Sequence, residues 1–316
     1  MSASTSTTPS STPASTPASA SERPSSLVLG LSLVAMLLIW SFNYVAGKIA
    51  LRHLDPLTLA SFRLEVAGLV ILPFYFARRR RNPLLPRNSG AFAYLLLLGV
   101  LMAINQAGFT IGLGYTSSGR SSVILACGPV IVLLFARAMK QEALTATKIL
   151  GTAFALTGVL LLETEQGVFV RSPFLTGDLI TLLGTTSFAL YVVFGKRLAG
   201  TYDALSMNTS NFLVAALVAL PFAIWQGIHL HWKTVSWAGW AGMFYMAALS
   251  SVLAYSLFYW ALRYMTASRV TAINYFQPVG AIVLAALLLG EQPTRHLLVG
   301  ACFVLVGVYL AERGTA

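Results

Sequence analysis

The chain alternates long apolar runs with short polar breaks, and this alternation excludes most soluble folds. Hydrophobic residues make up 57% of the 316 residues and charged residues only 10%, far from the composition of soluble domains. Most of the runs are close to the roughly 20 residues that a helix needs to cross a bilayer. The runs cover residues 27–51, 57–76, 91–113, 117–136, 145–162, 179–198, 205–228, 237–262, 270–289 and 297–311. We therefore predict an all-α membrane protein with ten transmembrane helices.

The first 26 residues have a different composition. They are almost entirely Ser, Thr, Pro and Ala, which cannot bury enough apolar surface to offset the entropy of the chain. The segment also lacks the basic region, short apolar run and cleavage site of a secretory signal. We predict a disordered cytoplasmic tail over residues 1–26 that stays on the mature protein.

The basic residues are distributed unevenly between the two sides of the predicted bundle. A net charge of +11 would suggest a nucleic-acid partner in a soluble protein. If the N-terminus is inside, however, 14 of the 21 Lys and Arg residues fall on the cytoplasmic side, 6 fall on the other side, and Arg63 lies within a span. This asymmetry predicts that both termini are cytoplasmic. We expect the lipid bilayer and a small-molecule substrate as partners and no nucleic acid; the oligomeric state stays open, with a monomer as one alternative.

An internal repeat divides the chain into two halves. A shift of 149 residues aligns 115–163 with 264–312 without a gap and pairs Pro129 with Pro278 and Glu142 with Glu291. A shift of 148 residues extends the match upstream to the first and sixth spans. We therefore predict two repeats of five helices each, at residues 27–163 and 177–312. Because five is odd, the second copy must be inverted in the membrane, which is typical of secondary transporters.

The repeated segments resemble a known family. Residues 115–142 and 264–291, together with the run Trp40–Lys48 in the first span, are similar to the two EamA repeats of the drug/metabolite transporter superfamily. The resemblance covers essentially residues 27–312. It implies a ten-helix carrier of the inner (plasma) membrane that often exports amino acids or other metabolites without ATP hydrolysis, and it implies no cofactor.

Two prolines mark the expected transport site. Pro129 and Pro278 lie near the middle of the fourth and ninth spans, where a proline removes a backbone hydrogen bond and kinks the helix. Interruptions in corresponding spans of two repeats indicate a binding site, although prolines can also shape a bundle without binding anything.

Polar and aromatic residues within the spans are expected to form the walls of an uncharged cavity. Each ring can also be ordinary packing, whereas a buried amide requires a partner. The predicted substrate-binding residues are Trp40, Asn43, Asn105, Gln106, Tyr191, Tyr255, Tyr259, Asn274 and Gln277.

Arg63 and Glu65 are the charged residues that lie well inside the predicted spans. Glu65 is our candidate for the proton carrier that couples transport, with a structural role as the alternative. Arg63 is expected to snorkel or to cross-link helices. Glu291, at the end of the ninth span, is expected to accept hydrogen bonds at the N-terminus of the helix that follows.

Other functions have less support in the sequence. The four His residues form no HExxH motif, and no nucleotide-binding motif or intramembrane nucleophile pattern is present, so we expect neither an enzyme nor a metal site. Cys127 and Cys302 are expected to be packing residues. The predicted function is a secondary-active, alternating-access transporter of a small metabolite, an exporter of amino acids or related compounds that is coupled to protons or to exchange. A channel or facilitator is the alternative, and an intramembrane enzyme a weaker one.

Overall fold

The computed structural model describes residues 24–78, 89–139, 145–163, 173–195, 204–261, 264 and 276–313. Most of the predicted tail, residues 1–23, lies outside these ranges. Within the described residues all the regular structure is helical, and no strand is present. The predicted all-α class is therefore confirmed.

The first half of the chain forms six of these helices. They are α1 (Ser26–Leu51), α2 (Pro56–Arg78), α3 (Ser89–Tyr115), α4 (Ser118–Ala126), α5 (Gly128–Ala138) and α6 (Ala146–Glu163). The second half contains α7 (Leu175–Gly195), α8 (Ala204–His229), the short 3₁₀ helix η2 (Trp232–Thr234), α9 (Trp237–Phe244), the π-helix η3 (Tyr245–Ala254), α10 (Tyr255–Ala261), α12 (Gln277–Leu289) and α13 (Arg295–Arg313).

Seven helical segments among the described residues are long and apolar enough to cross a membrane. One of them combines α4 with most of α5 and another combines α9, η3 and the start of α10. Three shorter apolar helices, at Ala146–Leu161, Gln277–Leu289 and Arg295–Leu310, accompany them. The predicted number of ten full-length spans is thus not reached by the long helices alone. For the ninth predicted span, residues 270–275 lie outside the described residues.

The side chains are distributed as in a protein that lies in lipid. Large apolar residues point outward on many helices; Leu31 of α1, Leu217 of α8 and Leu287 of α12 are 61%, 68% and 76% exposed. Polar side chains such as Asn43, Gln106 and Thr110 are buried instead. This arrangement suits hydrocarbon outside and a polar interior, and the protein is therefore a multi-pass membrane protein.

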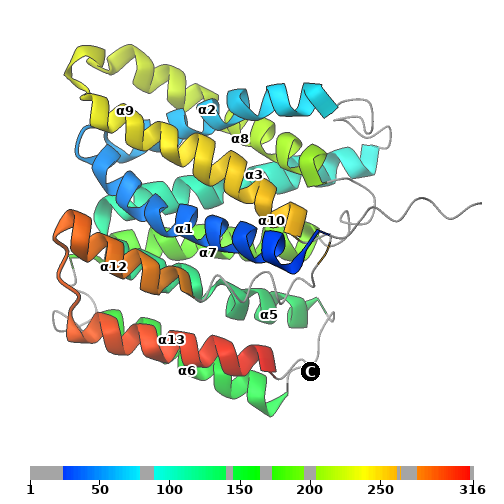
Figure 1. Ribbon diagram of the computed structural model, residues 1–316, viewed down its shortest axis with the longest axis vertical. Helices are drawn as coiled ribbons and strands as arrows, with labels where there is room; N and C mark the ends of the chain where they lie inside the picture. The colour runs from blue at the N-terminus through cyan, green and yellow to red at the C-terminus, as the bar shows by residue number, and fades with distance from the viewer. Residues whose placement is uncertain are drawn as a thin grey trace, which may run out of the picture.

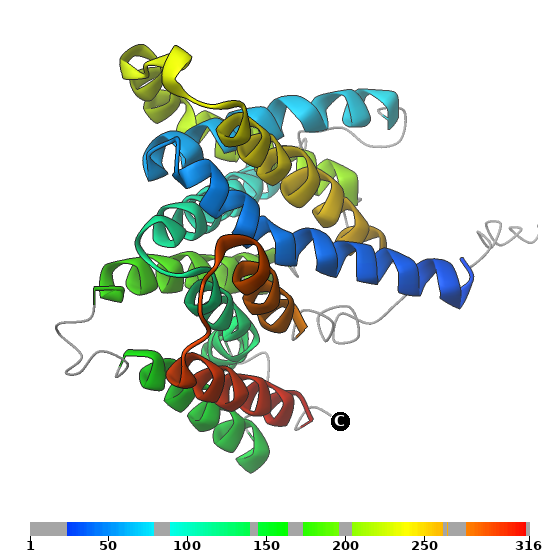
Figure 2. The ribbon, with the colours of Figure 1, turned by 60° about the vertical axis from the view of Figure 1, so that its left-hand side comes forward.

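Helix contacts are repeated when the two halves are exchanged. Helix α6 packs against its repeat partner α13, and α2 packs against its repeat partner α8. The contact of α3 with α7 corresponds to that of α1 with the α9–η3–α10 segment, and the contact of α1 with α12 corresponds to that of α7 with α5. Figures 1 and 2 show α6 and α13 side by side at one edge of the bundle. The two repeats are therefore related by an approximate twofold axis.

Glycines let the repeat-related helices approach closely and reveal their direction. A Cβ on Gly158 would lie 2.6 Å from the carbonyl oxygen of Gly300, and a Cβ on Gly307 would lie 2.5 Å from that of Gly151. Small residues at such contacts are typical of membrane helix pairs. Because Gly158 faces Gly300 while Gly151 faces Gly307, α6 and α13 run antiparallel.

Both ends of the described chain lie at the same end of the bundle. The start of α1 and the end of α13 are at the right of Figures 1 and 2, whereas the connection from α12 to α13 is at the opposite end.

Candidate functional site

Residues Trp40 of α1, Gln106 of α3 and Tyr255 of α10 meet between the two repeats. The indole of Trp40 donates a hydrogen bond to the carbonyl of Ser250 at 3.2 Å, and the Trp40 and Tyr255 rings meet edge-on at 5.3 Å. The side-chain amide of Gln106 donates to the Tyr255 hydroxyl at 3.4 Å. Three residues predicted from the sequence thus lie in one cluster, to which each repeat contributes.

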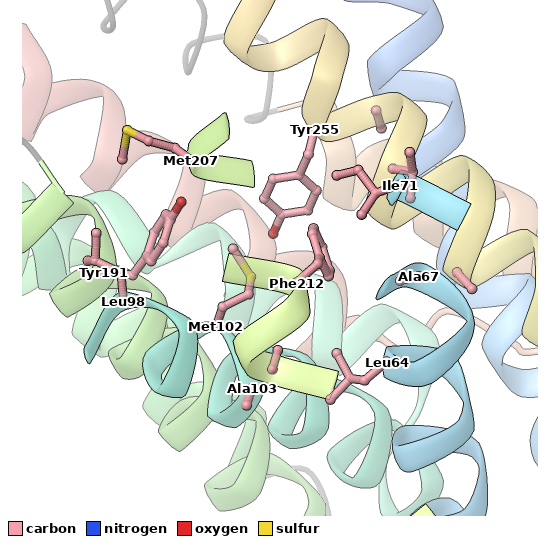
Figure 3. Packing of buried hydrophobic residues seen from close by; sticks show 14 of the residues in the cluster. Leu64, Ala67, Ile71, Leu98, Met102, Ala103, Tyr191, Met207, Phe212 and Tyr255 are labelled. Carbon is pink, nitrogen blue, oxygen red and sulfur yellow. The ribbon is translucent and has the colours of Figure 1, made fainter. Parts of the chain in front are cut away.

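Tyr191 of α7 belongs to the same buried cluster, together with Tyr255, Phe212 and Met102 (Figure 3). The rings of Phe212 and Tyr255 meet edge-on at 5.9 Å. The Tyr191 hydroxyl accepts a hydrogen bond from the Asn211 side chain at 2.8 Å. The cluster therefore combines aromatic faces with a few polar groups at their edges, as small-molecule sites do.

Two further predicted amides have different surroundings. The Oδ1 atom of Asn43 is buried and has no hydrogen-bond partner among the described residues. The Asn105 amide instead donates to the carbonyl of Gly184 at 3.0 Å across the α3–α7 contact. Asn105 therefore links two helices.

The fourth span is interrupted at its proline. Helix α4 ends at Ala126, and α5 begins at Gly128 with Pro129 in its first turn. In the second repeat α12 begins at Gln277, with Pro278 in its first turn. The carbonyl of Gln277 accepts a bond from the Ser41 hydroxyl of α1 at 3.5 Å. Asn274 and the side chain of Tyr259 lie outside the described residues.

A π-helix lies in the wall of the cluster and was not predicted. Segment η3 carries Ser250 and Ser251, both buried, and the Ser251 hydroxyl bonds the carbonyl of Met246 five residues earlier at 3.0 Å. π-Helical segments occur frequently at functional sites.

Sequence reasoning also missed two asparagines of α8. Asn208 is fully buried, and neither of its side-chain polar atoms is hydrogen-bonded within the part of the chain that the structure describes; the Asn211 side chain donates to the Tyr191 hydroxyl. The available signal was residues 206–211, in which five of six residues are polar at the start of an apolar span.

Arg63 of α2 is buried and contacts other helices rather than snorkelling to the surface. Its guanidinium donates to the Thr110 hydroxyl at 3.0 Å and to the Ser251 hydroxyl at 3.2 Å, and it lies 5.6 Å from the centre of the Phe109 ring. Of the two predicted roles of Arg63, these contacts fit the cross-linking of helices. Glu65 is half-buried, and its Oε1 atom is buried without a hydrogen-bond partner in the described ranges.

The end of the bundle opposite the termini is held by a buried ion pair and by hydrogen bonds to a carboxylate, both between the repeats. Asp178 of α7 forms a buried ion pair with Arg120 of α4 and accepts a bond from Thr116 at 2.6 Å. Glu291 accepts bonds from the backbone N–H and the hydroxyl of Ser118, both at 3.0 Å. We predicted that Glu291 accepts hydrogen bonds from the helix that follows it. In the structure Glu291 instead caps the N-terminus of α4, which belongs to the other repeat. A cavity of 180 Å³ lies beside these residues.

Among the described residues no group of His, Cys, Asp and Glu could hold a metal ion. Cys127 is buried and Cys302 exposed, both as free thiols.

Comparisons with known proteins agree on a transporter family. The sequence profile of the EamA-like transporter family matches residues 28–164 and 175–312. The uncharacterized transporter YoaV of Bacillus subtilis is 24% identical over 285 residues, which cover 89% of this chain and 95% of YoaV. The uncharacterized inner membrane transporter YedA of Escherichia coli K12 is 27% identical, covering 84% of each protein. One crystal structure superposes with a TM-score of 0.59 over 92% of this chain and 100% of that chain at 16% identity, which shows a shared fold.

Proposed function

Because the chain belongs to the EamA-like transporter family, we propose that it is a secondary-active carrier of a small metabolite that works by alternating access. Both repeats contribute to the aromatic cluster of Trp40, Gln106, Tyr191 and Tyr255, and this placement carries the proposal. A solute bound there becomes accessible from either side when one repeat rocks against the other. We propose export of amino acids or related compounds, coupled to protons or to exchange of solutes.

The proposed topology has ten crossings in two inverted repeats. Seven long spans and three shorter apolar helices among the described residues support the number ten. The antiparallel contact of α6 with α13 supports the inversion. With 14 basic residues on one predicted side against 6 on the other, we place both termini in the cytoplasm and the protein in the inner membrane.

In this proposal the ion pair of Asp178 with Arg120 and the hydrogen bonds from Ser118 to Glu291 hold the outer end closed. They join α4 of the first repeat to α7 and to the end of α12 of the second repeat. Opening the outer end must break them, so they set part of the free-energy difference between the outward-open and inward-open states.

A binding screen tests the placement of the site. We expect amino acids or related metabolites to raise the melting temperature of the purified protein, and Trp40→Ala and Gln106→Ala, which change the aromatic cluster, to weaken the binding of each compound that does so. The control Arg313→Ala, at the end of α13, should bind as the wild type does. Unchanged binding in both site variants, or loss in the control alone, would place the site elsewhere.

A further inference from the structure

The hydrogen-bond donors of the Arg63 guanidinium are not all paired with neighbouring groups among the described residues. The side chain is 1% exposed, and the guanidinium has donors on three nitrogens. Two of these nitrogens donate to the neutral hydroxyls of Thr110 and Ser251. The third, Nε, is buried and has no hydrogen-bond partner within the part of the chain that the structure describes.

The positive charge of Arg63 also has no carboxylate partner among the described residues. Glu65 lies on the same helix, but two residues apart places it about 200° around the helix axis, and no ion pair joins the two. An arginine stays protonated in proteins, and a buried charge is costly unless it is paired. Ionisable residues within membrane spans are therefore rare and mark binding or transport paths.

The contacts of Arg63 cross the boundary between the repeats. Arg63 and Thr110 belong to α2 and α3 of the first repeat, whereas Ser251 belongs to η3 of the second. The 3.2 Å bond from Arg63 to Ser251 must change when one repeat moves against the other. A solute group that replaces Ser251 as the acceptor would then bind during this motion.

Two short chains of contacts lead from Arg63 to the aromatic cluster. Thr110, which accepts from Arg63, donates to the carbonyl of Gln106 at 2.8 Å, and the Gln106 amide bonds Tyr255. Ser251 directly follows Ser250, whose carbonyl accepts from Trp40. The cationic group and the aromatic rings are thus two ends of one buried region.

We propose that Arg63 binds the carboxylate of the transported solute, and that the solute carries this carboxylate on an apolar or aromatic body. The carboxylate accepts from Nε and from the guanidinium nitrogen now facing Ser251, in the two-bond geometry that arginine favours. The apolar body packs against Trp40 and Tyr255. The proposal rests on the carrier function proposed above and names the chemistry of its solute.

Paired compounds test this directly on the purified full-length protein. The panel consists of apolar and aromatic carboxylates, such as 3-phenylpropionate and L-phenylalanine, each beside its neutral or cationic amide. We expect a carboxylate to raise the melting temperature and its amide to bind at least about 30-fold more weakly, the loss typical when a buried charge loses its partner. Absence of a shift with every carboxylate, or equal binding of acid and amide, would overturn the proposal.

Three variants assign the effect to the side chain. Arg63→Gln should lose at least about 30-fold in affinity for the carboxylate, and Arg63→Lys, which keeps the charge without the paired donors, should lose less. The exposed Arg52 supplies the matched control, and Arg52→Gln should bind as the wild type does. If Arg63→Gln does not fold, Arg63→Lys decides, and wild-type affinity in that variant would contradict the proposal.

Three further outcomes separate this proposal from the carrier function. Equal stabilisation by sodium chloride alone would identify a resident inorganic anion and overturn the role of the solute carboxylate. Transport of an uncharged or cationic solute that Arg63→Gln leaves unchanged would refute the role of Arg63 and leave the carrier intact. Carboxylate binding that depends on Arg63, without transport of that compound, would instead refute the carrier.

Discussion

Replacement of Asp178 by Asn should destabilise the protein by about 3 kcal/mol. The Asp178 and Arg120 side chains are 4% and 2% exposed and form an ion pair, with Arg120 Nε 2.9 Å from the carboxylate. Breaking a buried pair by removing one partner costs about 3–5 kcal/mol. Asn keeps the size of the side chain and can still accept from Thr116, so the lower end of this range applies.

Thermal unfolding in detergent, followed by tryptophan fluorescence, measures this loss. At about 2 °C per kcal/mol, the melting temperature of Asp178→Asn should fall by about 6 °C. The control Lys233→Gln, which neutralises an exposed charge, should leave it unchanged. The double variant Arg120→Leu with Asp178→Leu should recover part of the loss, because no unpaired charge remains. A fall of less than about 1 °C in Asp178→Asn would refute the reasoning.

Three other predictions concern packing, coupling and orientation. Gly158→Leu should separate α6 from α13, because even a Cβ at this position would lie 2.6 Å from the backbone oxygen of Gly300. Thermal unfolding should show a loss of about 1–3 kcal/mol in the free energy of unfolding. The control Gly30→Leu, which has open space at its Cβ, should lose little. Glu65→Gln should abolish the pH dependence of transport into proteoliposomes, and an unchanged pH profile would exclude Glu65 as the proton carrier. In a cysteine-free background, Lys233→Cys should react with a membrane-impermeant maleimide from outside intact cells; labelling only after lysis would reverse the predicted orientation.

The helices and the repeat could be predicted from the sequence because both depend on local or repeated signals. Apolar runs located the spans, and the pairing of Gly151 with Gly300 and of Gly158 with Gly307 at a shift of 149 residues corresponds to the antiparallel contact of α6 with α13. Pro129 lies where α4 and α5 separate, because a proline disrupts its own helix regardless of the neighbouring helices.

The partners of buried polar groups could not be predicted, because they are set by long-range packing. No local pattern indicates that Arg120 pairs with Asp178, 58 residues away, and Asp178 has no acidic counterpart in the first repeat. The bond from Arg63 to Ser251 spans 188 residues and reaches into a π-helix, whose wider turn has no simple sequence signature. Trp40, Gln106 and Tyr255 were found because polar and aromatic residues are conspicuous in apolar spans, whereas Asn208 and Asn211 were overlooked within a polar run.

Solute counterflow in proteoliposomes tests the carrier function most directly. Vesicles that contain the purified protein are loaded with a compound from the binding screen, and uptake of the same labelled compound is measured. A carrier predicts saturable uptake that is accelerated by solute on the opposite side of the membrane. Uptake that rises linearly with concentration and is unaffected by internal solute would contradict the carrier and indicate a channel.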